Sequence, residues 1–94
     1  MNNSTELDSE VIDEVEISSP PKYRLILFND DVNSFDHVII SIITILQTEP
    51  EVAVKQAMLA HELGKCTIKS SDDKDELAQY HSQFANVNIS TEVQ

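Results

Sequence analysis

The chain has few of the residues that brace or staple a small fold: one cysteine, one glycine, three prolines and no tryptophan. A lone Cys66 cannot form an intramolecular disulfide or a cysteine-rich zinc site, and we expect it to be a buried, inert thiol. No apolar run reaches the roughly 18 residues that cross a bilayer. The acidic N-terminus resembles neither a secretory signal nor a transit peptide. These absences predict a cytoplasmic protein.

Basic residues are also scarce, with 6 against 17 acidic residues and a net charge of −11. Such a surface repels phosphate groups, so nucleic acids and anionic membranes are not expected partners. Residues 1–19 hold six acids, no base and no sustained apolar period, which is typical of a disordered tail. We therefore predict an acidic tail at 1–19 and one small domain at 20–94, too small for an elaborate enclosed active site.

The apolar pattern of the domain predicts the order β-α-α-β-α-β. The segment 35–47 holds five isoleucines and a valine, which favour a strand, but their 3.6-residue spacing predicts a helix with Ser34 as its N-cap. A capping-box spacing at Thr48 and Glu51 starts a second helix, which ends at Gly64. The other expected elements are strands at 23–28, 65–69 and 87–93, and a helix that opens at 71–73.

Each expected helix has a face that we predict to be apolar. In the second helix the residues sharing this face are Val54, Ala57, Met58 and His61. In the third helix they are Leu77, Tyr80 or His81, and Phe84.

The polar stretch Asn29-Asp30-Asp31 lies between a predicted strand and a predicted helix. Asn and Asp are common turn residues, so a simple turn is one interpretation. Two successive carboxylates, with His61 expected nearby, also suit a small cation such as an ammonium group. Acid–base catalysis lacks a nucleophile, and an oxygen-rich metal site that includes His37 is weak because we expect His37 to face solvent.

Together the motifs resemble the ClpS family, adaptors that deliver N-degron substrates to Clp-family AAA+ unfoldases. The resemblance covers Pro20 to about Gln79 and rests on three pieces: Pro20-Pro21-x-Tyr23, Asn29-Asp30-Asp31, and Met58-Leu59-Ala60-His61-x-x-Gly64-Lys65. It implies an α+β fold like the C-terminal domain of the ribosomal stalk protein. That fold has a three-stranded antiparallel sheet with three helices packed on one face.

The resemblance also implies a binding site. Asn29, Asp31 and His61 would bind the free α-amino group of a substrate, and Asp30 would lie beside them. An α-ammonium is partly charged at neutral pH, and charge-assisted hydrogen bonds can hold it. The pocket for the first side chain would be walled by Asn33, Phe35, Val38, Ala57, Ala60 and Val87. No cofactor, metal or catalytic residue is implied.

The chain departs from the family pattern at several positions. Phe35 replaces a frequent methionine, Ala57 a larger apolar residue, and Lys69 a common glycine. In the third helix the usual acidic and basic partner-facing positions fall on Lys74 and Gln79, so docking to the usual unfoldase is expected to be altered. The partner implied is the N-terminal domain of a ClpA- or ClpC-type unfoldase.

The expected function is therefore that of a monomeric, non-enzymatic adaptor for N-end rule proteolysis. One alternative is a protein-interaction domain of the same fold that serves another complex through the acidic tail. A second alternative is a small hydrolase using Asp30, Asp31 and His61, for which the sequence offers no nucleophile.

Overall fold

The structure is a computed structural model that describes residues 19–94, so the predicted tail lies outside the described residues except for Ser19. The elements are β1 (Tyr23–Phe28), α1 (Phe35–Leu46), α2 (Pro50–Leu63), β2 (Lys65–Ser71), α3 (Lys74–Asn86) and β3 (Thr91–Val93). This order confirms the predicted β-α-α-β-α-β succession. Within residues 19–94, no helix is long and apolar enough to span a membrane.

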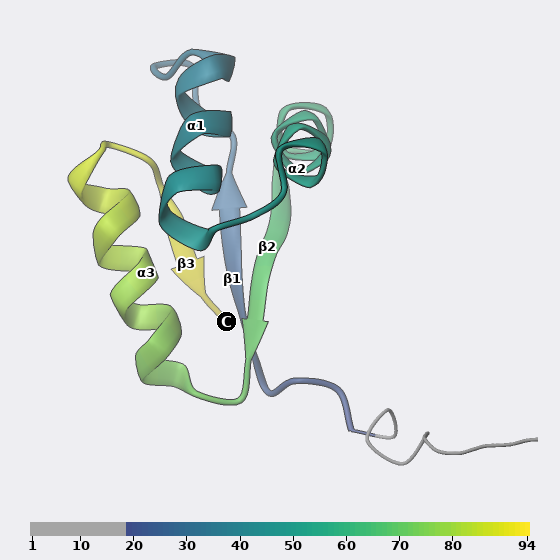
Figure 1. Cartoon of the computed structure of the whole chain (residues 1–94), viewed down its shortest axis with the longest axis vertical. Helices are drawn as coiled ribbons and strands as arrows, with labels where there is room; N and C mark the ends of the chain where they lie inside the picture. The colour runs from purple at the N-terminus through teal and green to yellow at the C-terminus, as the bar shows by residue number, and fades with distance from the viewer. Residues whose placement is uncertain (1–18) are drawn as a thin grey trace, which may run out of the picture.

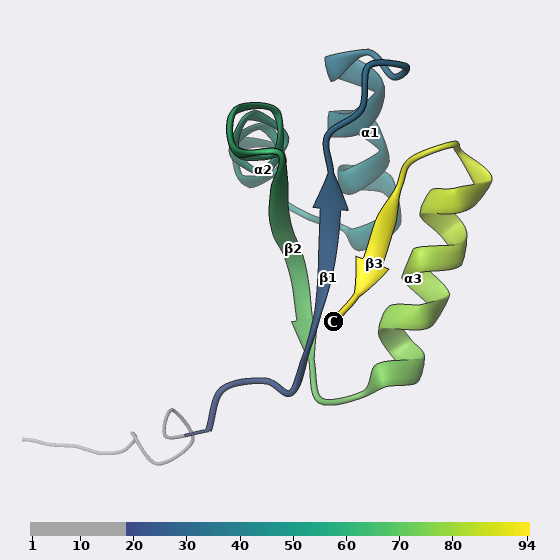
Figure 2. The same ribbon diagram turned by 180° about the vertical axis from the view of Figure 1, so that it is seen from behind.

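The strands form one antiparallel sheet in the order β2-β1-β3, so β1 is the central strand. The helices lie on one face of this sheet, as the two opposite views show (Figures 1 and 2). The α+β fold class is therefore confirmed. The central strand β1 runs toward the end of the molecule where α1 and α2 lie (Figure 1).

The core lies between the sheet and the helices. Leu25 and Leu27 alternate along β1 and are 0% and 1% exposed, because side chains two residues apart point to the same face of a strand. The helices contribute the other largest fully buried side chains, which are Ile42, Leu77 and Phe84. Leu77 and Phe84 were both predicted on the apolar face of the third helix, and this part of the prediction is confirmed.

The helix ends follow local capping chemistry, with one exception. The Ser34 hydroxyl accepts a hydrogen bond from the His37 N–H at 3.1 Å, which confirms Ser34 as the N-cap of α1. Gly64 ends α2 with a φ of 92°, in the left-handed region that favours glycine. The predicted capping box is wrong, because Glu49 is the N-cap of α2 and makes no side-chain capping bond.

The buried face of α2 differs from the predicted one. Ala53, Ala57 and Ala60 are the buried residues, so of the predicted face only Ala57 is confirmed. Val54 is half-buried, Met58 is 45% exposed and His61 is exposed. Side chains of one carbon let the helix backbone approach its neighbours closely, so the alanines take the inward positions. Three of the predicted residues, Val54, Met58 and His61, each lie one position after a buried alanine, so the predicted face is rotated by about one residue from the true inner face.

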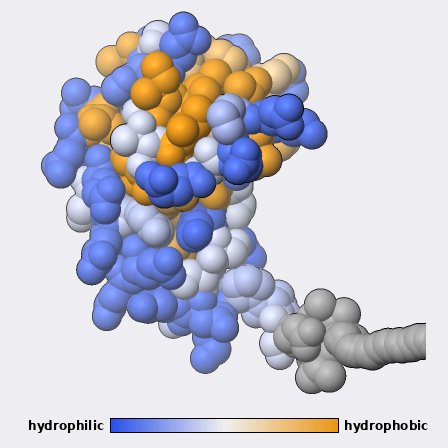
Figure 3. All heavy atoms as spheres, viewed as in Figure 1, coloured by the Kyte–Doolittle hydropathy of each residue, from blue (hydrophilic) through white to orange (hydrophobic). Residues whose placement is uncertain are grey.

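Several large apolar side chains consequently remain on the surface of the helical layer. Figure 3 shows apolar residues gathered over the part of the molecule where α1 and α2 lie. In the two helices the exposed ones are Phe35, Ile40, Val52, Met58, Leu59 and Leu63, and Val32 is exposed in the loop before α1.

β2 is longer than the predicted 65–69 and contains an irregularity. Leu25 pairs with Lys69 and Ile26 pairs with Thr67, so Ile68 is an extra residue on β2, as in a β-bulge. Cys66, on the same strand, is half-buried and not buried as predicted, and this partial burial raises the pKa of its thiol. A thiol in this state is mostly protonated at neutral pH, in agreement with an inert cysteine.

The last strand starts later than predicted. Val87 caps α3, and its N–H donates to the Phe84 carbonyl at 3.0 Å. Asn88 then takes a left-handed conformation with a φ of 67°. This turn reverses the chain before β3, so the predicted strand over 87–93 is wrong for its first half. In that half, Val87 caps α3 and Ile89 is buried in the core, and neither residue pairs with β1.

Candidate functional site

The candidate site forms where β1 ends beside the end of α2. Phe28, the last residue of β1, pairs with Lys65, the first residue of β2. One residue further, the Asn29 N–H donates a hydrogen bond to the Gly64 carbonyl at 3.0 Å. Because Gly64 directly follows α2, this bond places the polar loop after β1 next to the last turn of that helix. Asn29 and His61, 32 positions apart, come together in this way.

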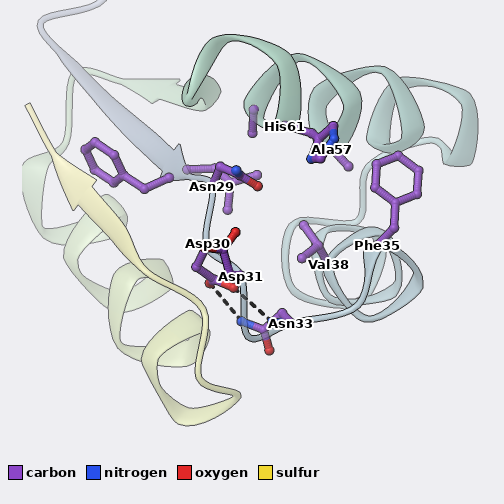
Figure 4. Close-up of a pocket in the computed structure, with 11 residues that line it drawn as sticks. Asn29, Asp30, Asp31, Asn33, Phe35, Val38, Ala57 and His61 are labelled. Atoms are coloured by element: carbon purple, nitrogen blue, oxygen red, sulfur yellow. Dashed lines mark hydrogen bonds between the residues drawn. The ribbon is translucent and has the colours of Figure 1, made fainter.

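A cavity of about 410 Å³ opens between the loop, α1 and α2. In Figure 4 the loop residues lie opposite His61 and Ala57 of α2, and Phe35 and Val38 approach from α1. The structure brings nine of the ten predicted site residues to this cavity: Asn29, Asp30, Asp31, Asn33, Phe35, Val38, Ala57, Ala60 and His61.

Val87 is the predicted site residue that does not line this cavity. It lies at the end of α3, where its carbonyl meets the His37 ring. Two lining residues, Leu27 and Phe28, were missed. Both could have been predicted from the sequence, because they directly precede Asn29 in the first strand.

The cavity is polar at one end and apolar along its walls. The exposed side chains of Asn29, Asp31 and His61 form the polar part. Ala57 and Ala60, 3% and 2% exposed, belong to the apolar wall. This combination of a few polar groups with an apolar lining is typical of a ligand pocket.

The Asp30 carboxylate accepts three hydrogen bonds from within the loop. Its Oδ1 accepts the backbone N–H groups of Val32 and Asn33, both at 2.9 Å, and its Oδ2 accepts the Asn33 side-chain amide at 2.9 Å. These bonds, first that of the Asn33 backbone N–H, lower the pKa of Asp30, and the nearby charge of His37 acts in the same direction. Asp30 is thus an ionised turn residue that shapes the loop.

Asp31 is in the opposite situation. It is exposed, and within residues 19–94 its carboxylate accepts no hydrogen bond. A free carboxylate beside an amide and an imidazole offers acceptors for the three N–H groups of an ammonium ion. The structure therefore separates two adjacent acids, one used by the fold and one available to a ligand.

The structure gives no support to the metal alternative. In the part of the chain that is described, no group of three or more His, Cys, Asp or Glu side chains could hold a metal ion. His37 does not face solvent as predicted: it is half-buried, and its Nε2 lies 2.9 Å from the Val87 carbonyl. The prediction considered only its place in the first helical turn and missed the approach of the chain after α3.

The bonds of Asp30 predict a pH-dependent contribution to stability. The pKa of Asp30 is lowered in the folded state, so its contribution is complete above the unfolded value of 3.8 and is lost as the pH falls through the folded value. We expect Asp30→Asn to reduce the free energy of unfolding by about 1 kcal/mol at pH 7.

Urea denaturation of both proteins between pH 2 and 7 measures this contribution. The difference should shrink towards zero at the acidic end, where the wild-type carboxyl is also neutral. Asp31→Asn, at the adjacent exposed acid whose carboxylate accepts no hydrogen bond within residues 19–94, is the matched control. A difference that stays constant over the whole pH range would contradict the assignment.

The comparisons with known proteins agree on one family. The family described as "ATP-dependent Clp protease adaptor protein ClpS" matches residues 18–91. The ClpS adapter of Oleidesulfovibrio alaskensis is 32% identical over 71 residues, which cover 73% of this chain and 68% of that protein. The ClpS adapter of Desulfotalea psychrophila is 35% identical over 54 residues, which cover 57% of this chain and 53% of that protein.

A solved structure shares the fold. Agrobacterium tumefaciens ClpS2 bound to L-phenylalaninamide superposes with a TM-score of 0.74 at 15% identity, covering 81% of this chain and 98% of that one. At this identity the likeness concerns the fold alone.

Proposed function

Since the chain belongs to the ClpS family of adaptors of the ATP-dependent Clp protease, we propose that it recognises N-degrons, binding the free α-amino group and a large apolar first side chain. The observation that carries the proposal is the cavity in which exposed Asn29, Asp31 and His61 adjoin an apolar wall. An N-terminal residue presents these two chemistries on one carbon atom, an ammonium group and a side chain.

The polar end suits an α-amino group. Asp31 supplies a negative charge, and Asn29 and a neutral His61 can each accept one further N–H. Acetylation removes the positive charge and two N–H donors, so the same groups would be left unpaired against a blocked N-terminus. Leaving polar groups of a site unpaired is the strongest way to reject a close analogue.

The apolar end suits the first side chain. Leu27, Val38, Ala57 and Ala60 supply apolar surface, and Phe35, 43% exposed, stands at the edge of the cavity. A volume of about 410 Å³ leaves room for an aromatic side chain. The Agrobacterium protein is bound to L-phenylalaninamide, a molecule with a free α-amino group and a phenyl ring, which supports the same ligand class here.

The bound protein would then be handed to the unfoldase partner of the Clp protease. No catalytic step is assigned to this chain, because the cavity lining contains no serine, threonine or cysteine nucleophile. We propose the N-terminal domain of a ClpA- or ClpC-type unfoldase as the partner, contacted through the exposed face of α3 that carries Lys74 and Gln79.

The first prediction concerns the amine. Asp31→Ala and His61→Ala should each weaken binding of a Phe-headed peptide by about 2 kcal/mol, the lower end for a truncated charged contact, because the cavity is open to water. Fluorescence anisotropy with a labelled peptide measures the change. The same peptide with an acetylated N-terminus should bind wild type no better than it binds the variants.

Two exposed acids provide matched controls for this measurement. Asp36→Ala and Glu62→Ala remove similar charges close in sequence to the site without removing a residue of the cavity lining. Both should bind the free peptide with an affinity close to that of wild type. Equal affinity of wild type for free and acetylated peptides would exclude amine recognition and favour an interaction domain of another kind.

The second prediction concerns the first residue. Phe, Tyr, Trp and Leu should bind more tightly than Ile and Val, because β-branching places bulk at the edge of the cavity beside Phe35. Each methylene left unburied costs about 0.8 kcal/mol, so small side chains should also bind weakly.

Phe35→Ala should therefore admit Ile and Val with little effect on Phe. A peptide array over all twenty first residues, probed with wild type and Phe35→Ala, gives the profile. Ile40→Ala, at a 61% exposed position of the same helix, is the control and should leave the profile unchanged. If wild type already binds Val-headed peptides as tightly as Phe-headed ones, Phe35 does not restrict entry.

The third prediction concerns the partner. Lys74 is the first residue of α3 and stands where the family usually has an acid. A ClpA N-terminal domain whose surface is complementary to that acid would be repelled by the positive charge of Lys74. We expect weak binding to the ClpA domain of an unrelated bacterium and tighter binding after Lys74→Glu. Isothermal titration measures both, with Lys65→Glu on exposed β2 as control. Tight binding that Lys74→Glu leaves unchanged would contradict this contact.

A further inference from the structure

Two side chains connect the polar end of the cavity to a turn that is distant in the sequence. The Asn33 side-chain amide donates to the Asn88 carbonyl at 2.7 Å, and the His37 Nε2 lies 2.9 Å from the Val87 carbonyl. A carbonyl can only accept, so the His37 Nε2 carries the proton in this contact. Two consecutive carbonyls of the turn between α3 and β3 are therefore held by the segment around the start of α1.

The first of these contacts continues into the loop. The Asn33 amide also donates to the Asp30 Oδ2 at 2.9 Å, a bond drawn in Figure 4. Both of its N–H groups are thereby used, one on the loop and one on the turn. The chain of contacts runs from the turn at Asn88 through Asn33 to Asp30, the residue that directly precedes Asp31.

The loop has space into which it could move without these contacts. A second hollow, of about 570 Å³, lies on the other side of the loop and is bordered by Asp30, Val32, His81 and Asn88. Val32 is 87% exposed and gives the loop little apolar anchorage. Packing alone does not fix this segment, and its position depends on hydrogen bonds.

We propose that Asn33 and His37 are positioning residues, which hold the loop so that the Asp31 carboxylate faces the amine site. This inference rests on the proposed amine recognition. It states that the position of the Asp31 carboxylate is set by two residues that do not themselves contact the amine. Asn33 acts through Asp30, and His37 acts by fixing the first turn of α1 to the end of α3. His37 is also close enough to favour the ionised form of the Asp30 carboxyl.

The test compares free and acetylated peptides. Wild type, Asn33→Ala, His37→Leu and His37→Gln are measured with Phe-headed peptides whose N-termini are free or acetylated, by anisotropy. The readout is the ratio of the two affinities. Asn33→Ala and His37→Leu should lower this ratio by about tenfold, as expected when one charged contact is misplaced.

His37→Gln provides the conservative rescue. The glutamine Nε2 is also a donor and lies at a similar distance from Cα, so it can replace the contact with the Val87 carbonyl. Its ratio should stay within about threefold of wild type, a change of less than 1 kcal/mol. Thr44→Ala, at an exposed position of α1, is the control for a substitution that touches neither contact.

A purely structural role gives a different result. It would lower the melting temperature and weaken both peptides alike, so an unchanged ratio in both Asn33→Ala and His37→Leu would overturn the proposal. Should His37→Leu fail to fold, Asn33→Ser gives the same comparison, because serine is too short to reach the Asn88 carbonyl. If wild type itself does not distinguish the peptides, the proposed function fails instead.

Discussion

The hydrogen bond from the Asn29 N–H to the Gly64 carbonyl, 3.0 Å long, is the contact on which the site depends. It extends the β1–β2 pairing by one step, beyond the last strand residue and onto the residue that ends α2. That step is possible because Gly64 takes a φ of 92° and turns the chain from helix directly into β2. Two elements remote in sequence thereby present their polar ends to one cavity, with no connecting loop between α2 and β2.

The two adjacent acids differ in what the fold requires of them. A short loop leaves backbone N–H groups without partners, and Asp30 accepts two of them, from Val32 and Asn33. A carboxylate that already accepts three hydrogen bonds has little acceptor capacity left for an ammonium group. The neighbouring Asp31, exposed and without such bonds among the described residues, retains its full capacity. One acid shapes the loop and the other remains free for a ligand.

The order of the elements could be predicted, because the apolar run of β1 and the 3.6-residue spacing along α1 are strong local signals. Most of the cavity lining was expected from the resemblance to the ClpS family and not from periodicity. The inner face of α2 was predicted only in part, at Ala57. Ala53 and Ala60 were missed as members of this face, since alanines contribute little to an apolar pattern even where they are the best buried residues of the helix. The contact of His37 with Val87 was equally out of reach. This contact joins residues 50 positions apart through a ring nitrogen and a backbone carbonyl, and no periodic pattern in the sequence indicates such a contact.

The buried alanines also determine which part of the cavity wall can vary in shape. At Ala57 and Ala60 the wall is close to the helix backbone, so its position follows the placement of α2 against the sheet. Backbone positions in a packed fold change little, because any shift disturbs many contacts. Phe35 is large, 43% exposed and attached to the first turn of α1, where its ring can change rotamer. If the proposed function holds, discrimination between first side chains therefore depends on α1, while α2 provides a fixed surface.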